Sequence, residues 1–276
     1  MELISLLPLW YQYTFVTLLG LIIGSFLNVY IYRFHTGKSL SGRSHCMSCA
    51  RPLRWFELLP VVSYLALRGR CRICGSYIPF RYVLVELLTA GLFGLGFMFM
   101  PFGWLLLVWF LLIALLVVIL MYDLDHLIIP NELVVAVSGV AILLVCMEAS
   151  WRVSFAFFDN VYAAIGAFIF YGGLWFISGG RWIGFGDAKL AMPLAFILGP
   201  LGVFSFVVLS FWIGAGVSVL LLGIQKWLQR GKHRLSKYGF SLTMKSEVPF
   251  APFMIAAFIL VAWLHFDVLS LIEAIL

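Results

Sequence analysis

Hydrophobic positions fill most of this chain in runs that are too long for the core helices of a water-soluble domain. The runs begin near residue 11 and recur to the end of the chain, with one long polar interruption between Arg33 and Arg81. A helix needs about 20 consecutive apolar residues to cross a bilayer core of about 30 Å. The pattern therefore predicts an all-α polytopic membrane protein with one small extramembrane module.

Two of the apolar runs are too long to be single helices. The run over 83–122 is broken at Met100–Gly103, and the run over 190–224 is broken at Gly199–Gly202. At about 1.5 Å per residue either run would exceed the bilayer core by a wide margin, so we interpret each as a helical hairpin. The pattern then predicts eight spans, near 11–32, 84–100, 103–122, 131–148, 160–178, 187–199, 202–224 and 250–268.

Composition agrees with a membrane protein and raises a question about charge. Of 276 residues, 64% are apolar and 11% are charged, whereas soluble domains have about 45–50% and about 25%. The formal net charge is +6. A basic excess of this size is compatible with nucleic-acid binding, with anionic lipid or with membrane topology.

The distribution of the basic residues favours topology. If the amino terminus lies outside, the inner loops hold 17 of the 18 Lys and Arg residues, nine of them between Arg33 and Arg81, and only Arg152 lies outside. This asymmetry follows the positive-inside rule. It predicts eight spans with both termini outside, the lipid bilayer as the surrounding partner, and no nucleic-acid partner.

Four of the five cysteines form two pairs, Cys46-x-x-Cys49 and Cys71-x-x-Cys74, separated by 21 residues. Paired cysteines at this spacing are typical of a tetrahedral zinc site, and the predicted cytosolic side disfavours disulfides. Four thiolates leave no open position for a catalytic water, so we expect structural zinc in a zinc-ribbon-like module. The alternative is four unligated or redox-active thiols.

Five acidic residues lie in or beside the spans on the predicted inner side: Glu86, Asp123, Asp125, Glu132 and Asp187. Ionisable groups at membrane depth are costly and are functional candidates by default. Asp123 ends the third span and Asp187 begins the sixth, so both face the cytosol. Two carboxyl groups brought together in a partly desolvated site cannot both ionise, so they share one proton. The protonated one can then act as a general acid, while the other activates a water for attack on a peptide carbonyl.

Neighbouring residues refine the choice of the pair. Asp123 and Asp125 point to nearly opposite sides of a helix, and we favour Asp123 because it lies deeper. Glu132 is explained by the dipole of the helix that it begins. We expect Gly184 and Gly186 to allow close backbone approach and positive φ, which leaves room for an extended substrate.

Alternatively, the acidic residues have a purely structural role. In that case the carboxylates cap helices and balance Lys189 or Arg181.

Together these motifs resemble those of the type IV prepilin peptidases, also called leader peptidases, over nearly the whole chain. Two departures are Met47, where the family often has Pro, and Ala251, where Gly is usual. The motifs are Gly24–Val29 with Arg33, Gly42–Ser44, both cysteine pairs, Leu67–Cys71, Arg81-Tyr82, Val85–Leu87, Asp123-x-Asp125 through Pro130-Asn131, Gly184-x-Gly186-Asp187-x-Lys189 and Pro249–Phe253.

The resemblance implies an aspartyl endopeptidase of the bacterial inner membrane that acts at the cytosolic face. Its substrates would be prepilins and pseudopilins of type IV pili, type II secretion or competence, cut after a short basic leader. Asp123 and Asp187 match the catalytic aspartates of the family, with Gly184, Gly186 and Lys189 as supporting residues.

The resemblance also implies a second activity, methylation of the new amino terminus by S-adenosylmethionine. Gly69 and Arg70 are carried over to methyl transfer as neighbours of the second cysteine pair. The expected division is a first span at 1–32, a cytosolic four-cysteine module at 33–82 and a seven-span peptidase domain at 83–276.

Three other functions compete with this interpretation. A presenilin-type intramembrane protease also uses a Tyr-Asp and a Gly-x-Gly-Asp pair, but the cysteine module favours the prepilin branch. A membrane methyltransferase would need the aspartates only for structure. An ion or proton transporter is disfavoured because the acidic residues cluster at one face of the membrane.

Overall fold

The computed structural model describes residues 7–37, 39, 42–100, 103–148, 153–230, 248–268 and 270. The chain divides into two compact units, Met1–Met121 and Tyr122–Leu276, which we describe separately. Every regular element in the described ranges is helical, as the all-α prediction requires.

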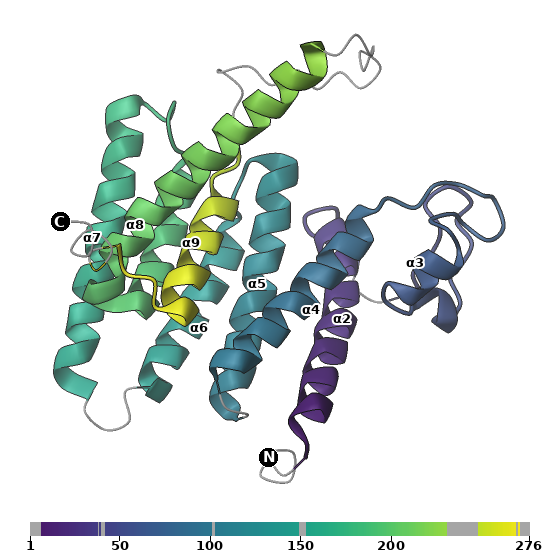
Figure 1. Cartoon of the computed structure of the whole chain (residues 1–276), viewed down its shortest axis with the longest axis horizontal. Coiled ribbons are helices and arrows are strands. Elements are labelled where there is room, and N and C mark those ends of the chain that lie inside the picture. The colour runs from purple at the N-terminus through teal and green to yellow at the C-terminus, as the bar shows by residue number, and fades with distance from the viewer. Residues whose placement is uncertain are drawn as a thin grey trace. The chain divides into compact units, whose positions relative to one another are not determined.

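The helices follow the predicted order (Figure 1). They are α2 (Leu9–Arg33), η1 (Trp55–Leu58), α3 (Val62–Ala66), α4 (Arg81–Phe99), α5 (Trp104–His126), α6 (Asn131–Glu148), α7 (Val153–Ser178), α8 (Phe185–Arg230) and α9 (Ala251–Leu264). Within the described residues, α2, α4, α5, α7 and α8 are long and apolar enough to cross a membrane, and α6 and α9 are shorter apolar helices.

Helix α8 contains two of the predicted spans and is interrupted where the sequence predicted a break. Gly199 has φ 66° and ψ −174° within the otherwise helical run. Pro200 follows it, and a residue before proline avoids the α conformation. A Cβ at position 199 would lie 2.6 Å from Asn160 Oδ1. The break is therefore present, but as one non-helical residue rather than as a connecting loop.

Helices of the second unit expose large apolar side chains, as lipid-facing helices do. Phe176 on α7 is 79% exposed, and Leu201 on α8 is 89% exposed. Water-soluble proteins rarely leave extended apolar surface uncovered. The exposed apolar surface and the long apolar helices together support a membrane environment.

In the first unit, α2 and α4 lie side by side at very short range (Figure 1). A Cβ at Gly20 would lie 2.7 Å from Ala90 Cα, and one at Gly24 would lie 2.8 Å from Glu86 Cα. Two glycines four residues apart allow this close backbone approach, as in other membrane helix pairs. The crossing brings Glu86 against the middle of α2.

The cysteine module occupies the polar segment between α2 and α4. It contains η1, α3 and two isolated β-bridges, one joining His45 to Pro52 and the other joining Arg70 to Tyr77. Asn28 on α2 donates a hydrogen bond of 2.9 Å to the backbone carbonyl of Tyr82, at the start of α4. This bond fixes the two helices where the module begins and ends.

In the second unit, α7 and α9 both pack against α8. The buried hydroxyls of Tyr171 on α7 and Ser210 on α8 are hydrogen-bonded at 2.7 Å. A Cβ at Gly214 on α8 would lie 3.0 Å from the Phe253 ring. The contact with Phe253 positions the amino-terminal end of α9, which supplies part of the candidate site.

Candidate functional site

Asp123 lies in the last turn of α5, and its side chain is directed inward. The residue is 4% exposed, whereas Asp125 is exposed. Asp123 Oδ2 accepts a hydrogen bond of 3.1 Å from the backbone N–H of Ala251, the first residue of α9. The first N–H groups of a helix have no partner within it, so Asp123 caps α9.

Asp187 lies in the first turn of α8 and is 7% exposed. Its Oδ2 accepts a hydrogen bond of 3.1 Å from the backbone N–H of Gly184. The Asp187 backbone N–H in turn donates to the Gly184 carbonyl at 3.2 Å. The loop that enters α8 is thus closed around the carboxyl.

The structure brings Asp123 and Asp187 together from helices that are distant in sequence. The start of α8 packs against the segment that follows α5, since a Cβ at Gly186 would lie 3.0 Å from Ile129 Cβ and Lys189 Nζ donates to Asn131 Oδ1 at 2.8 Å. In each aspartate, the hydrogen bond runs through Oδ2. Within the described residues neither Oδ1 atom has a hydrogen-bond partner, which leaves one oxygen of each carboxyl available to a substrate or a water.

The two glycines before Asp187 act through lack of volume rather than through backbone conformation. A Cβ at Gly186 would lie 3.0 Å from Ile129 Cβ, and one at Gly184 would lie 3.3 Å from Asp187 Oδ2. Neither glycine has a positive φ. The expectation of close approach is confirmed, and the expectation of positive φ is wrong.

Lys189 links the start of α8 to the start of α6 through a hydrogen bond. Its Nζ donates a hydrogen bond of 2.8 Å to Asn131 Oδ1 and lies 4.8 Å from the centroid of the Phe185 ring. No ion pair of Lys189 with a carboxylate occurs in the described part of the chain. Lys189 therefore positions a turn and does not neutralise either aspartate.

Sequence reasoning missed the backbone partner of Asp123. Ala251 belongs to the Pro249–Phe253 motif, which supported the family resemblance but had no assigned role. Pro252 lies in the first turn of α9, which is a favoured place for proline. The proline marked a helix start, but nothing in the sequence showed which side chain would cap it.

The four paired cysteines of the first unit converge as predicted. Their sulfur atoms all lie within 4.8 Å of one another. Cys46 Sγ and Cys74 Sγ are 3.7 Å apart, and a tetrahedral zinc with bonds of about 2.3 Å would separate its sulfur ligands by roughly 3.8 Å. The donor set and its spacing fit a zinc ion.

The two cysteine knuckles are repeats of one structure at an offset of 25 residues. The backbone N–H of Cys46 donates to the Arg51 carbonyl at 2.9 Å, and that of Cys71 donates to the Ser76 carbonyl at 2.8 Å. The residues after the second cysteines, Ala50 and Gly75, have φ 55° and 68°. The equal spacing of the pairs was the signal for this repeat.

Backbone N–H groups point at the first cysteine of each knuckle. Those of Cys49 and Ser48 lower the pKa of Cys46 to about 6. Those of Cys74 and Ile73 lower the pKa of Cys71. Both shifts favour the thiolate, which is the form that binds a metal.

Glu57 braces the first knuckle from η1. Arg51 donates to its two carboxylate oxygens at 2.7 and 3.1 Å, and the backbone N–H of Arg54 donates at 2.8 Å. The Arg51 guanidinium lowers the pKa of Glu57 to about 2. Both oxygens of Glu57 are therefore occupied by structural hydrogen bonds.

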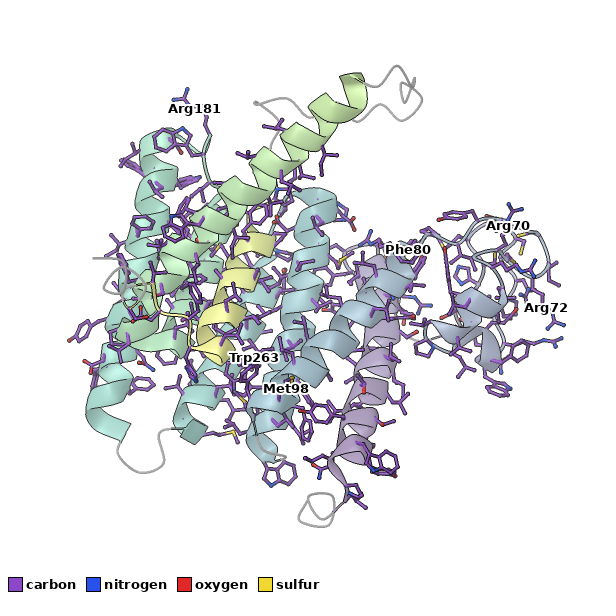
Figure 2. The ribbon with its side chains drawn as sticks, in the orientation of Figure 1. Arg70, Arg72, Phe80, Met98, Arg181 and Trp263 are labelled. Carbon is purple, nitrogen blue, oxygen red and sulfur yellow. The ribbon has the colours of Figure 1, made fainter. Side chains whose placement is uncertain are left out.

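Gly69 and Arg70 lie in different surroundings. Gly69 is buried with φ 65°, and a Cβ there would lie 2.8 Å from Tyr64 Oη. Arg70 is exposed at the outer part of the module (Figure 2). Gly69 thus packs against Tyr64, and Arg70 forms a β-bridge with Tyr77; both tyrosines line the cavity described below.

Comparison with known proteins gives consistent matches along the chain. A model described as the bacterial peptidase A24 N-terminal domain matches residues 18–100, and one described as the type IV leader peptidase family matches residues 109–219. No solved structure matches the chain.

Three curated relatives share the name prepilin leader peptidase/N-methyltransferase. The protein of Aeromonas hydrophila is 31% identical over 95% of this chain and 94% of its own length. That of Dichelobacter nodosus is 30% identical over 91% and 90%. That of Myxococcus xanthus is 44% identical over 140 residues, which cover 49% of this chain and 41% of that relative.

Proposed function

The chain belongs to the type IV leader peptidase family, and from this premise we propose that Asp123 and Asp187 are the catalytic pair with which it removes the basic leader from type IV prepilins and pseudopilins. One observation carries the assignment. Two buried carboxyls, one at the end of α5 and one at the start of α8, are each anchored through a single oxygen by a backbone N–H.

The proposed chemistry is general acid–base hydrolysis of a peptide bond. One carboxyl holds the proton that passes to the departing amine, and the other removes a proton from the attacking water. Because Oδ2 of each residue is fixed by a backbone N–H, the remaining oxygens face the reacting atoms without rotation of the side chains. The fixed orientation would lower the cost of reaching the transition state.

The neighbouring residues take positioning roles in this proposal. Gly184 allows Asp187 Oδ2 to lie against the loop that enters α8, and Gly186 allows Ile129 to pack against that loop. Lys189 holds the first turn of α8 through Asn131. None of the three donates or accepts the transferred proton.

We place the protein in the bacterial inner membrane with the aspartates at the cytosolic face and both termini outside. The charge distribution supports this orientation, because 17 of the 18 basic residues fall in loops on one side. Arg152 and most of the segment Lys226–Lys245 lie outside the described residues. A basic leader in the cytosol would then reach the aspartates, while the apolar part of the pilin stays in lipid.

We further propose that residues 33–82 serve N-methylation of the new amino terminus, and residues 83–276 serve hydrolysis. Cys46, Cys49, Cys71 and Cys74 would hold a structural zinc, and S-adenosylmethionine would be the methyl donor. The combined name of the curated relatives supports the second activity. Gly69 would act through Tyr64, while Arg70 is assigned only by its place in the sequence motif.

Incubation of the purified protein with a prepilin and S-adenosylmethionine tests both activities in one measurement. Mass analysis of the product should show loss of the leader and addition of one methyl group. An uncleaved substrate would contradict the peptidase assignment. A cleaved product without a methyl group would contradict only the second activity.

A further inference from the structure

We infer that a cavity between the cysteine module and helices α2 and α4 binds the methyl donor, and that Glu86 accepts the proton of the amine that is methylated. This inference rests on the proposed methyl-transfer activity. It adds to that proposal a binding site and a catalytic residue, both within the first unit, and it extends the methyl-transfer region beyond residue 82 to Glu86 on α4.

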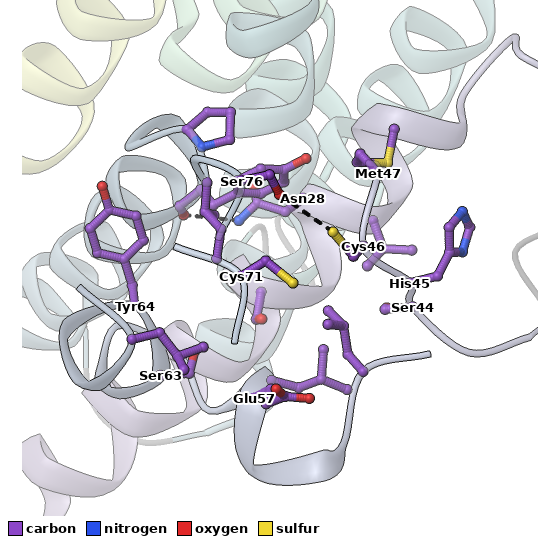
Figure 3. A pocket seen from close by; sticks show the side chains of 18 of the residues that line it. Asn28, Ser44, His45, Cys46, Met47, Glu57, Ser63, Tyr64, Cys71 and Ser76 are labelled. Atoms are coloured by element: carbon purple, nitrogen blue, oxygen red, sulfur yellow. Dashed lines mark hydrogen bonds between the residues drawn. The ribbon is translucent and has the colours of Figure 1, made fainter. Parts of the chain in front are cut away.

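The cavity has the size and the lining of a small-molecule site. Its volume is about 470 Å³, within the range of about 300–1,000 Å³ that ligand pockets usually have. Figure 3 shows Ser63 and Tyr64 of α3 on one side of it, and Cys46 and Met47 on the other. The walls thus come from both halves of the module.

Aromatic rings and small polar groups line the cavity together. Tyr32 of α2, Tyr64 of α3 and Tyr82 of α4 are all lining residues. Ring faces attract organic cations, and they also offer stacking surfaces to a planar base. An adenosyl methylsulfonium carries both a cation and a planar base, so its chemistry matches this lining.

Two carboxyls line the cavity, and within the described residues only Glu57 is paired with a cationic side chain. Glu57 is fully engaged with Arg51 and Arg54, as described above. Glu86 is 7% exposed, and its Oε2 accepts a hydrogen bond of 2.8 Å from the Val61 backbone N–H. Within the described residues Glu86 has no ion pair.

A buried carboxyl without a basic partner is costly unless something else compensates its charge. Glu86 faces a cavity, so a bound cation can provide that compensation. The methyl donor is a sulfonium cation, and its acceptor begins as an ammonium cation. Both would be drawn to the same carboxyl.

The contact of Glu86 with the module is made by a strained residue. Val61, whose N–H bonds Glu86, has φ 59° and ψ −49°. A β-branched residue at positive φ is a marked outlier, and such strain is concentrated at functional sites. On the other side, Gly24 brings the backbone of α2 against Glu86. Glu86 is therefore held where α2, α4 and the module meet.

The transfer step requires only the amine, the methyl donor and the Glu86 carboxylate. The ammonium of the new amino terminus gives one proton to the Glu86 carboxylate. Its nitrogen lone pair then forms the bond to the methyl carbon, and the carbon–sulfur bond breaks. That electron pair stays on sulfur, which leaves as a neutral thioether, and the nitrogen becomes a methylated ammonium.

The test uses the full chain with two cavity variants and a matched control for each. Ser63→Phe places a ring in the cavity, and Leu65→Phe adds a similar ring to α3 at a residue that is 67% exposed and does not line it. Glu86→Gln keeps an oxygen for the Val61 N–H but removes the charge, and Glu132→Gln removes an exposed carboxyl from α6.

Binding of S-adenosylmethionine and of its uncharged product S-adenosylhomocysteine is measured by equilibrium dialysis, with zinc content as the check on folding. We expect Ser63→Phe to weaken donor binding at least tenfold and Leu65→Phe to bind like the wild type. Glu86→Gln should reduce the preference for the charged donor over the uncharged product, whereas Glu132→Gln should retain it. An unchanged preference in Glu86→Gln overturns the inference, as does wild-type donor binding by Ser63→Phe.

Methyl transfer is measured separately on a pilin peptide that is already cleaved. General-base catalysis typically contributes 100-fold or more, so Glu86→Gln should slow methylation by roughly 100-fold. Methylation at the wild-type rate would overturn the role of Glu86. Because this substrate needs no leader removal, failure of the aspartate assignment would appear only in a parallel prepilin cleavage assay.

Discussion

The carboxylate of Asp123 accepts a hydrogen bond from the backbone N–H of Ala251 at 3.1 Å, although 128 positions separate the two residues. The bond places the amino-terminal end of α9 directly against the end of α5. Both candidate aspartates are thus held at helix amino termini, Asp123 by α9 and Asp187 in the first turn of α8. The N-terminal end of a helix favours a negative group, so both carboxyls lie where the backbone can support developing charge.

The first prediction concerns the aspartates themselves. Asp123→Asn and Asp187→Asn should each slow prepilin cleavage by at least roughly 100-fold, because each removes a group that transfers a proton. Asp125→Asn is the matched control, since Asp125 lies two residues from Asp123 on the exposed side of α5. Cleavage is followed by mass in detergent-solubilised enzyme. Full activity of the Asp187 variant would contradict the catalytic assignment and would show that the aspartates have a structural role.

The second prediction concerns the close contact between Gly186 and Ile129. Gly186→Ala puts a methyl group 3.0 Å from Ile129 Cβ, and overpacking of this kind typically costs about 1–3 kcal/mol. Gly172→Ala on α7 is the control, since nothing lies within 4 Å of its added Cβ. Thermal unfolding and prepilin cleavage should both be impaired in the first variant only. Equal behaviour of the two variants would show that the contact with Ile129 has no consequence.

The third prediction concerns the link between α6 and α8. Lys189→Met and Asn131→Leu each remove the hydrogen bond of 2.8 Å between the two side chains. Each should lower the free energy of unfolding by about 1 kcal/mol. The double variant should cost about as much as either single one, because both break the same interaction. Strictly additive losses would mean that Lys189 acts through some other partner.

The helices were the most predictable part of this protein. Apolar runs of about 20 residues have one stable solution in lipid, since only a helix satisfies its own backbone there. Gly199 and Pro200 marked the break in α8 because glycine tolerates the required φ and proline cannot continue the hydrogen bonding. Both rules depend only on residues that are close together in the chain, so the helices and the break could be predicted from the sequence.

The candidate site was predictable only in part. Depth and helix periodicity separated Asp123 from Asp125 correctly, and the structure places one inside and the other outside. The Asp123 bond to Ala251 and the Glu86 bond to Val61 span 128 and 25 positions and use backbone N–H groups. Every residue except proline has such a group, so the partner could not be identified before the tertiary fold was known.

The fourth prediction compares two glycines of the second knuckle. Gly69→Ala should reduce methyl transfer, since its Cβ would meet Tyr64 Oη at 2.8 Å and displace a residue that lines the cavity. Gly75→Ala is the control, because it has a similar φ, no neighbour within 4 Å, and Ala50 as its counterpart in the first knuckle. Methylation of a cleaved pilin peptide is the measurement. Tyr64→Phe should partly restore the Gly69 variant, as it removes the nearest atom.

The fifth prediction separates the roles of the metal and the aspartates. Removal of metal by a chelator should loosen the cysteine module and abolish methyl transfer. A module of this size has little hydrophobic core, so the zinc would hold its two knuckles together. Hydrolysis should persist at first, since Asp123 and Asp187 need no metal for acid–base chemistry. Proteolysis within residues 42–80 reports on the module, and mass analysis of the pilin reports on each activity. If chelation stopped cleavage at once while the helices remained folded, the division of labour between the cysteines and the aspartates would be wrong.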